Sequence, residues 1–264
     1  MKVLETEQKI QNGIISVSKK HIIGDFAEHG HKFFEFEYVI SGHGKYCIDG
    51  SVYPIQERSL FFMSPSDFHS LKDCDIEIIN VMFTCDLCDS NLLYTLLKQD
   101  KNCVVNFSEN DSILVESLLL EMVESNDVDY MIQLLRCLLF KLSKSAGSDK
   151  SNIISNTPSH IQSAIIYILE NFHSNITLTD TAYHTKLAPA YLSTLFLKEM
   201  GTNFKPYLDQ IRFEYAIKLL KFTTLTISEV CSSSGFSDYT NFTRRFKIKF
   251  GCTPTEYRKI HKKS

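Results

Sequence analysis

Residues 235–258 read GFSDYTNFTRRFKIKFGCTPTEYR. Phe242 and Phe246 stand four positions apart in this stretch, so a helix places both side chains on one face. Gly235 suits a tight turn that needs a positive φ angle, and Ser237 suits the N-cap of the helix that follows. The stretch therefore predicts a turn that leads into an amphipathic helix.

The same plan occurs twice in this part of the chain. In each copy a short helix ends near a small residue, Ala182 or Cys231, where a second helix must cross closely. Leu192 and Phe196 in the first copy align with the two phenylalanines of the second. The predicted helix pairs span 176–182 with 189–200, and 225–231 with 238–250. A long amphipathic helix over 207–221 joins the two pairs, with an apolar side made of Leu208, Ile211, Tyr215, Leu219 and Leu220.

Over residues 177–258 the chain resembles the AraC/XylS family of bacterial transcription regulators. The densest match is the stretch 235–258, and the first copy matches through Tyr191-Leu192-Ser193, through 196–201 and on to Arg212 and Ala216. The resemblance implies two helix-turn-helix units that bind double-stranded DNA. In that plan the second helix of each unit enters the major groove, and the units read adjacent turns of one DNA face.

The position of each residue in that plan predicts its role at the DNA. The base-facing residues of the two second helices are Ala190, Ser193 and Thr194, then Thr240, Asn241, Thr243 and Arg244. Arginine pairs bidentately with guanine and asparagine with adenine, so the second unit carries the stronger readout. The residues better placed for phosphates are Lys198, Arg245, Lys247 and Lys249.

The first unit departs from the family pattern. Lys186 replaces the usual turn glycine, Ala188 replaces the usual N-cap serine, and Leu197 stands where the second unit has a lysine. Its base-facing residues are short and uncharged. We therefore expect it to discriminate bases weakly, through shape and apolar contact. The alternative for any single serine or threonine here is a solvated helix face.

Charge divides the chain in the same way. Residues 158–264 hold ten Lys and four Arg against three Asp and five Glu, a net charge of +6. The whole chain carries −3, so residues 1–157 carry −9. A basic C-terminal part beside an acidic N-terminal part fits a nucleic-acid module joined to another domain.

The N-terminal half reads as strands over residues 14–107. Short apolar or alternating runs are separated by turn signals, and Asp49-Gly50 predicts a two-residue hairpin because a type I′ turn needs positive φ at both positions. This half also contains His29, His31, Glu35 and Gly42, and later Pro65 with His69. These residues resemble the two motifs of cupin barrels.

Cupin enzymes bring such histidines and the glutamate together on one metal. His29, His31 and Glu35 are separated by even numbers, so one unbroken strand would turn all three to one face, and His69 would supply a fourth ligand. AraC-type sensor domains commonly keep this outline without using a metal, and the second motif here lacks its usual glycine. We therefore expect no metal and no cofactor, and a polar pocket for a small organic effector lined by His29, His31, Glu35, Tyr38 and His69.

Residues 113–123 and 131–142 then form a predicted antiparallel helix pair. An apolar stripe follows the second helix, and it consists of Met131, Leu134, Leu135, Leu138, Leu139 and Leu142. This stripe packs either on the protein's own sheet or on a second subunit. If it faces a second subunit, the N-terminal half is a dimer, and dimerisation would raise the affinity for paired DNA sites. We expect a homodimer.

The polar, small-residue-rich stretch 146–157 predicts a linker. The predicted fold class is α+β: a cupin-like β-barrel with an appended helix pair over 1–145, then an all-α tandem helix-turn-helix domain over 158–264. No apolar run is long enough to span a bilayer and the N-terminus is too charged for a signal peptide, so we expect a cytoplasmic protein that contacts no membrane.

Two hypotheses for function follow. The first is a sequence-specific DNA-binding transcription regulator, not an enzyme, that responds to a small-molecule effector, with RNA polymerase as an additional candidate partner. The alternative is a cupin metalloenzyme fused to a DNA-binding module. The regulator is favoured because an enzyme alone leaves the DNA-binding half unexplained.

Overall fold

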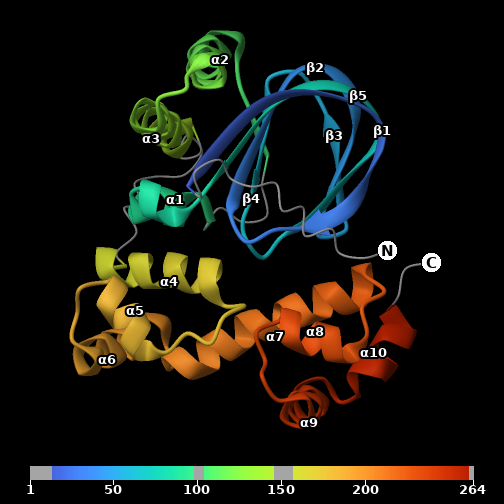
Figure 1. The fold of residues 1–264 in the computed structure, drawn as a ribbon, viewed down its shortest axis with the longest axis vertical. Helices are drawn as coiled ribbons and strands as arrows, with labels where there is room; N and C mark the ends of the chain where they lie inside the picture. Colours follow the sequence, from blue (N-terminus) through green and yellow to red (C-terminus); the bar gives the residue numbers. More distant parts are fainter. Residues whose placement is uncertain (1–13, 98–103, 146–156, 262–264) are drawn as a thin grey trace. The chain divides into compact units, whose positions relative to one another are not determined.

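The computed structural model describes residues 14–97, 104–145 and 157–261 (Figure 1). The chain divides into two compact units, with the boundary between Gln162 and Ser163. That boundary falls inside α4 (Ser159–Asn171), a few residues beyond the predicted linker. Apart from residue 157, the predicted linker lies outside the described residues.

The N-terminal unit is built on one antiparallel sheet. Its strands are β1 (Ile15–Gly30), β2 (Phe34–Ile48), β3 (Ser51–Ile55), β4 (Ser59–Met63), β5 (Phe68–Phe83) and β6 (Val104–Asn106). They pair in the order β1-β5-β2-β4-β6, and β3 pairs with β2. The antiparallel, cupin-like sheet is confirmed, but the predicted barrel is not closed. Among the described residues β1 and β6 remain edge strands, although the sheet curls strongly (Figure 1).

The long strands curl because their pairing is interrupted. The β2–β5 register shifts between Val39 and Ser41, and again between His43 and Lys45. Gly42 lies between these shifts with a φ of 104°, and a Cβ there would stand 2.0 Å from the carbonyl oxygen of Asp75. Only glycine permits so close an approach of two strands, and such bulges increase local twist.

The predicted hairpin at Asp49-Gly50 is confirmed. β2 ends at Ile48, β3 begins at Ser51, and these two residues face one another across the strands. Asp49 has a φ of 49° and Gly50 a φ of 83°, as a type I′ turn requires.

Both faces of the first part of β2, Phe34–Val39, are buried, and they meet different surroundings. Phe34 and Phe36 contact the rings of Phe62 and Phe83 on one face. On the other face, Val39 belongs to the apolar core inside the curled sheet. Because side chains alternate along a strand, Glu35 and Glu37 point into this core, whereas Tyr38 points away from it.

Helices complete the N-terminal unit. They are α1 (Ser90–Leu97), α2 (Glu109–Glu124) and α3 (Val128–Ser145), with a short 3₁₀ helix, η2 (Cys85–Leu87), before them. The predicted helix pair is therefore present, and α3 packs against α1 and α2. Every member of the predicted apolar stripe on α3 is buried within this single chain. The stripe is intramolecular core, and the interpretation of it as a subunit interface is wrong.

The C-terminal unit is entirely helical in the part that the structure describes. After α4 come α5 (Leu178–His184), α6 (Pro189–Met200), α7 (Phe204–Phe222), α8 (Ile227–Ser233), α9 (Tyr239–Phe250) and α10 (Pro254–His261). The two predicted helix-turn-helix units are α5–α6 and α8–α9, and α7 runs between them (Figure 1). The predicted core residues of these helices are buried, Ala182 and Cys231 included.

Local chemistry fixes where these helices begin. Both α5 and α8 begin at a capping box. Thr177 and Asp180 form that of α5, and Thr226 and Glu229 form that of α8. The N-cap of α9 is Asp238, whose carboxylate accepts the backbone N–H of Asn241, so the prediction of Ser237 was one residue early. The turn of the second unit is thus one residue longer than that of the first.

None of the helices within the described ranges is both long and apolar enough to cross a membrane.

Candidate functional site

The second helix of the second unit, α9, presents a polar face to solvent. Thr240, Asn241, Arg244 and Lys247 are exposed at helical spacing, and Ile248 is exposed beside them. The Arg244 guanidinium donates to the side-chain oxygen of Asn241 at 3.0 Å. The two side chains predicted to read bases therefore already lie together on one surface.

The second helix of the first unit, α6, exposes the same positions. With an offset of fifty residues, Ala190, Tyr191, Thr194, Leu197 and Lys198 take the places of the α9 residues just named. Tyr191 is 58% exposed and was absent from the predicted base-facing set. The sequence could have indicated this residue. Aligning Leu192 with Phe242 gives Tyr191 the position equivalent to that of Asn241. An exposed tyrosine there has no role in the core.

Two predicted base-facing residues lie deeper. Ser193 on α6 and Thr243 on α9 are half-buried. The Thr243 hydroxyl donates to the carbonyl oxygen of Tyr239 at 2.9 Å, and the Thr194 hydroxyl donates to that of Ala190 at 3.1 Å. These threonines keep only acceptor capacity for a further partner.

Arg245 is half-buried, and its guanidinium has partners within the fold. Its guanidinium forms an ion pair with Asp209 of α7 at 2.5 Å and lies over the ring of Phe213, 5.4 Å from the centroid. Asp209 also meets Lys205 at 3.3 Å. This contact joins α9 to α7 within the DNA-binding unit.

The other predicted phosphate contacts are surface lysines. Lys198, Lys247 and Lys249 are exposed near the ends of α6 and α9. The Lys249 ammonium lies 5.6 Å from the centroid of Phe213, and that of Lys198 lies 3.8 Å from a Glu199 carboxylate oxygen. Such exposed contacts are weak, so they leave both cations able to meet an anion.

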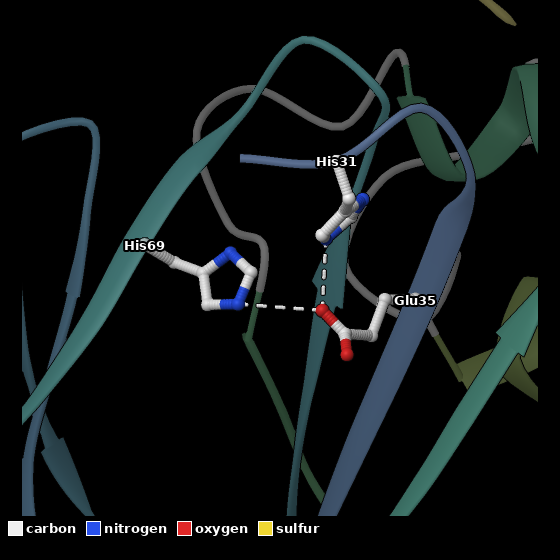
Figure 2. A group of neighbouring side chains, drawn as sticks. All are labelled: His31, Glu35 and His69. Carbon is white, nitrogen blue, oxygen red and sulfur yellow. Dashed lines mark ion pairs between the residues drawn. The ribbon is translucent and has the colours of Figure 1, made fainter. Parts of the chain in front are cut away.

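Three predicted ligand-binding residues of the N-terminal unit converge in its interior. The histidine–glutamate cluster consists of His31, Glu35 and His69, all buried (Figure 2). Glu35 Oε2 lies 2.8 Å from His31 Nε2 and 3.3 Å from His69 Nε2. Despite burial, the two histidines hold the pKa of Glu35 well below its usual range, so the carboxylate is charged.

The remaining two predicted residues take different positions. Tyr38 points away from the cluster, and its hydroxyl donates to Glu116 of α2 at 3.2 Å. His29 packs its ring on His69, with centroids 4.1 Å apart. The reasoning from an unbroken strand was also wrong, because β1 ends at Gly30 and β2 begins at Phe34. The cluster takes His31 from the connection between these strands, Glu35 from β2 and His69 from β5.

Further buried polar groups form hydrogen bonds on the side of Glu35 that faces away from the histidines. The Asn80 amide donates to Glu35 Oε1 at 2.5 Å and to Glu37 Oε1 at 3.1 Å. The Tyr46 hydroxyl donates to Glu37 Oε2 at 2.6 Å. Burial, together with the charge of Glu35, raises the pKa of Glu37 to about 7. Sequence reasoning missed Asn80 and Glu37, although Glu37 shares the strand face of Glu35.

Two family models match this chain. Residues 21–75 match the AraC-like ligand binding domain, and residues 181–260 match a helix-turn-helix domain. The first range includes the whole histidine–glutamate cluster, and the second includes α6 and α9.

Several proteins are similar to this chain in sequence. An uncharacterized HTH-type transcriptional regulator, YfiF of Bacillus subtilis, is 27% identical over 89% of this chain and 80% of its own length. The lactose operon transcription activator of Staphylococcus xylosus is 27% identical over 83% of this chain and 81% of its own. Among solved structures, the C-terminal domain of AraT, a response regulator from Geobacillus stearothermophilus, is 32% identical, with a TM-score of 0.40. It covers 42% of this chain and 92% of its own.

The two family matches agree with the fold, which has an N-terminal antiparallel sheet domain followed by tandem helix-turn-helix units. The chain belongs to the AraC family of transcription regulators, with an AraC-like ligand-binding domain followed by a DNA-binding domain.

Proposed function

We propose that this regulator reads DNA sequence mainly through Asn241 and Arg244 on α9. The observation that carries the proposal is the exposed polar face of α9. The same positions are exposed on α6, although the residues there are less polar. Arg244 and Asn241 carry the donors and acceptors that pair with guanine and adenine in the major groove. Their mutual hydrogen bond keeps both side chains on that face.

The first unit contributes shape and apolar contact. Its exposed face carries Tyr191, Thr194 and Leu197 in place of the asparagine, arginine and lysine of α9. A tyrosine ring and a leucine side chain suit thymine methyl groups and sugar edges better than base hydrogen bonds. The proposal therefore gives α6 a weaker sequence preference than α9.

Phosphate contacts fall to the exposed lysines Lys198, Lys247 and Lys249. In this proposal Arg245 orients α9 from within the fold instead, because its guanidinium already pairs with Asp209. The phosphate contacts of the three lysines supply affinity without sequence preference.

The N-terminal unit is the proposed sensor. The match to an AraC-like ligand binding domain and the buried polar cluster support an effector site there. We assign no catalysis to it, because similar proteins are transcription regulators. A homodimer and a contact with RNA polymerase stay predictions, and the dimer needs a surface other than the buried stripe of α3.

Arg244→Ala should weaken binding to a specific site by about 1–3 kcal/mol and relax preference at one base pair. Lys247→Ala, one helical turn away, should weaken specific and random DNA alike and flatten the salt dependence. Fluorescence anisotropy with specific and random duplexes at several salt concentrations measures both effects. Equal losses on both duplexes for Arg244→Ala would reject its role in base recognition.

A further inference from the structure

In the histidine–glutamate cluster, both histidines approach Glu35 at distances close to those between ligands on one ion (Figure 2). One ligand atom from each of His31, Glu35 and His69 lies within 4.8 Å of the other two. The two nitrogen-to-oxygen distances are 2.8 and 3.3 Å. Two ligand atoms about 2.0–2.1 Å from one metal, at octahedral or tetrahedral angles, are about 2.9–3.4 Å apart.

The surrounding hydrogen bonds leave these same atoms free. His31 Nδ1 lies 2.8 Å from the carbonyl oxygen of Phe33, so its N–H donates there and Nε2 keeps a lone pair in the neutral ring. The amide of Asn80 occupies Glu35 Oε1 and leaves Oε2 for the cluster. Metal-bound histidines and carboxylates are typically oriented by such outer contacts.

His69 has the greatest need of a partner. It is buried, and neither ring nitrogen has a hydrogen-bond partner among the described residues. Nε2 lies 3.3 Å from Glu35 Oε2. A buried polar atom without a partner is costly, and coordination of Nε2 would remove the cost at that nitrogen.

His29 stands outside this ligand set. Its Nδ1 lies 3.0 Å from the carbonyl oxygen of Ala27, and its ring packs on His69. The arrangement is therefore two imidazoles and one carboxylate. Nitrogen-rich ligand sets of this kind favour first-row transition ions over Mg²⁺ and Ca²⁺, and three protein ligands leave at least one coordination position open.

We propose that His31, Glu35 and His69 bind a divalent first-row transition-metal ion inside the sensor unit. This reverses the expectation from sequence that the domain needs no metal. The proposal rests on the proposed sensor role and adds a ligand to it. The ion is either the effector itself or the group to which an oxygen-bearing effector binds.

The full-length chain, stripped with a chelator and dialysed, should bind one equivalent of Co²⁺. Visible absorption bands of bound Co²⁺ follow the titration, and the Tm should rise because the ion binds only the folded state. Zn²⁺ should displace Co²⁺ from the same site. A chain that binds no Co²⁺, or whose Tm is unchanged by saturating Co²⁺, overturns the proposal.

Variants separate ligands from neighbours. His31→Gln and His69→Gln should each lower Co²⁺ affinity by at least about 100-fold, more than loss of an outer contact does. His29→Gln should lower it by less than tenfold. His21→Gln is the matched control, because His21 also pairs with a carboxylate, Asp75 at 2.8 Å, but on the surface. Equal loss in the His29 variant and the His31 variant overturns the three-ligand assignment.

A measurement on the wild-type chain tests the proposal even where the variants fail to fold. In long-range ¹H–¹⁵N spectra of the imidazoles, Zn²⁺ should shift the Nε2 signals of His31 and His69 and leave those of His21 unchanged. Absence of those shifts overturns the proposal. DNA binding by the same samples is measured separately, so loss of the metal site and loss of the proposed function are distinguishable.

Discussion

Leu138→Glu should unfold the N-terminal unit and should not release a folded monomer. Leu138 has no exposed surface within this single chain, because α3 packs it against its neighbours. The substitution removes a buried leucine, which alone costs about 2–5 kcal/mol, and adds a carboxylate without a partner. We expect loss of cooperative thermal unfolding of this unit, measured by circular dichroism and calorimetry.

Phe140→Glu is the matched control on the same helix. Phe140 is 56% exposed, so a carboxylate there remains in water and the fold should be kept. A folded, monomeric Leu138→Glu chain in sedimentation would contradict the structure and restore the stripe as a subunit interface.

Gly235→Ala should destabilise the DNA-binding unit by about 2–5 kcal/mol. Gly235 has a φ of 82°, and a Cβ there would lie 2.3 Å from the Phe172 carbonyl oxygen and 2.8 Å from Arg212 Nε. That arginine donates to Phe172 and Ser174 at 2.8 and 2.6 Å. A methyl group therefore disturbs the contacts that hold the end of α4, and chemical denaturation measures the loss.

Lys186→Gly tests the equivalent turn of the first unit. Lys186 has a φ of 58°, where a side chain is strained, so glycine should be neutral or stabilise by up to about 1 kcal/mol. Destabilisation by Lys186→Gly, or a Gly235→Ala chain as stable as the wild type, would show that the turn geometry is wrong.

The sequence predicted the helix-turn-helix units well because local signals agreed with one another. Phe242 and Phe246 marked the buried face, and Gly251 ends α9 in the left-handed conformation that glycine favours. The error at Ser237 was a single residue, since Ser and Asp are both good N-caps. A pattern that repeats within one helix can be recognised from the sequence without knowledge of the rest of the fold.

Contacts between distant residues were not predictable in this way. The charge of Arg245 and its place on α9 predicted a phosphate contact. Only the fold shows that Asp209, 36 positions earlier, pairs with it. Tyr38 shares a strand with Glu35 but lies on its opposite face. The stripe on α3 fitted two partners equally, because an apolar surface is the same whether the chain or a second subunit covers it.

In the proposed mode of binding, both helix-turn-helix units read one DNA face, and α9 carries most of the sequence information. Selection of bound duplexes from a random pool by the full-length chain tests this mode most directly. We predict one motif of two elements about one helical turn, or 10 base pairs, apart, with one element strongly and the other weakly specified. Arg244→Ala should erase a position in the strong element. No enriched motif, or a motif unchanged by Arg244→Ala, would contradict the claim.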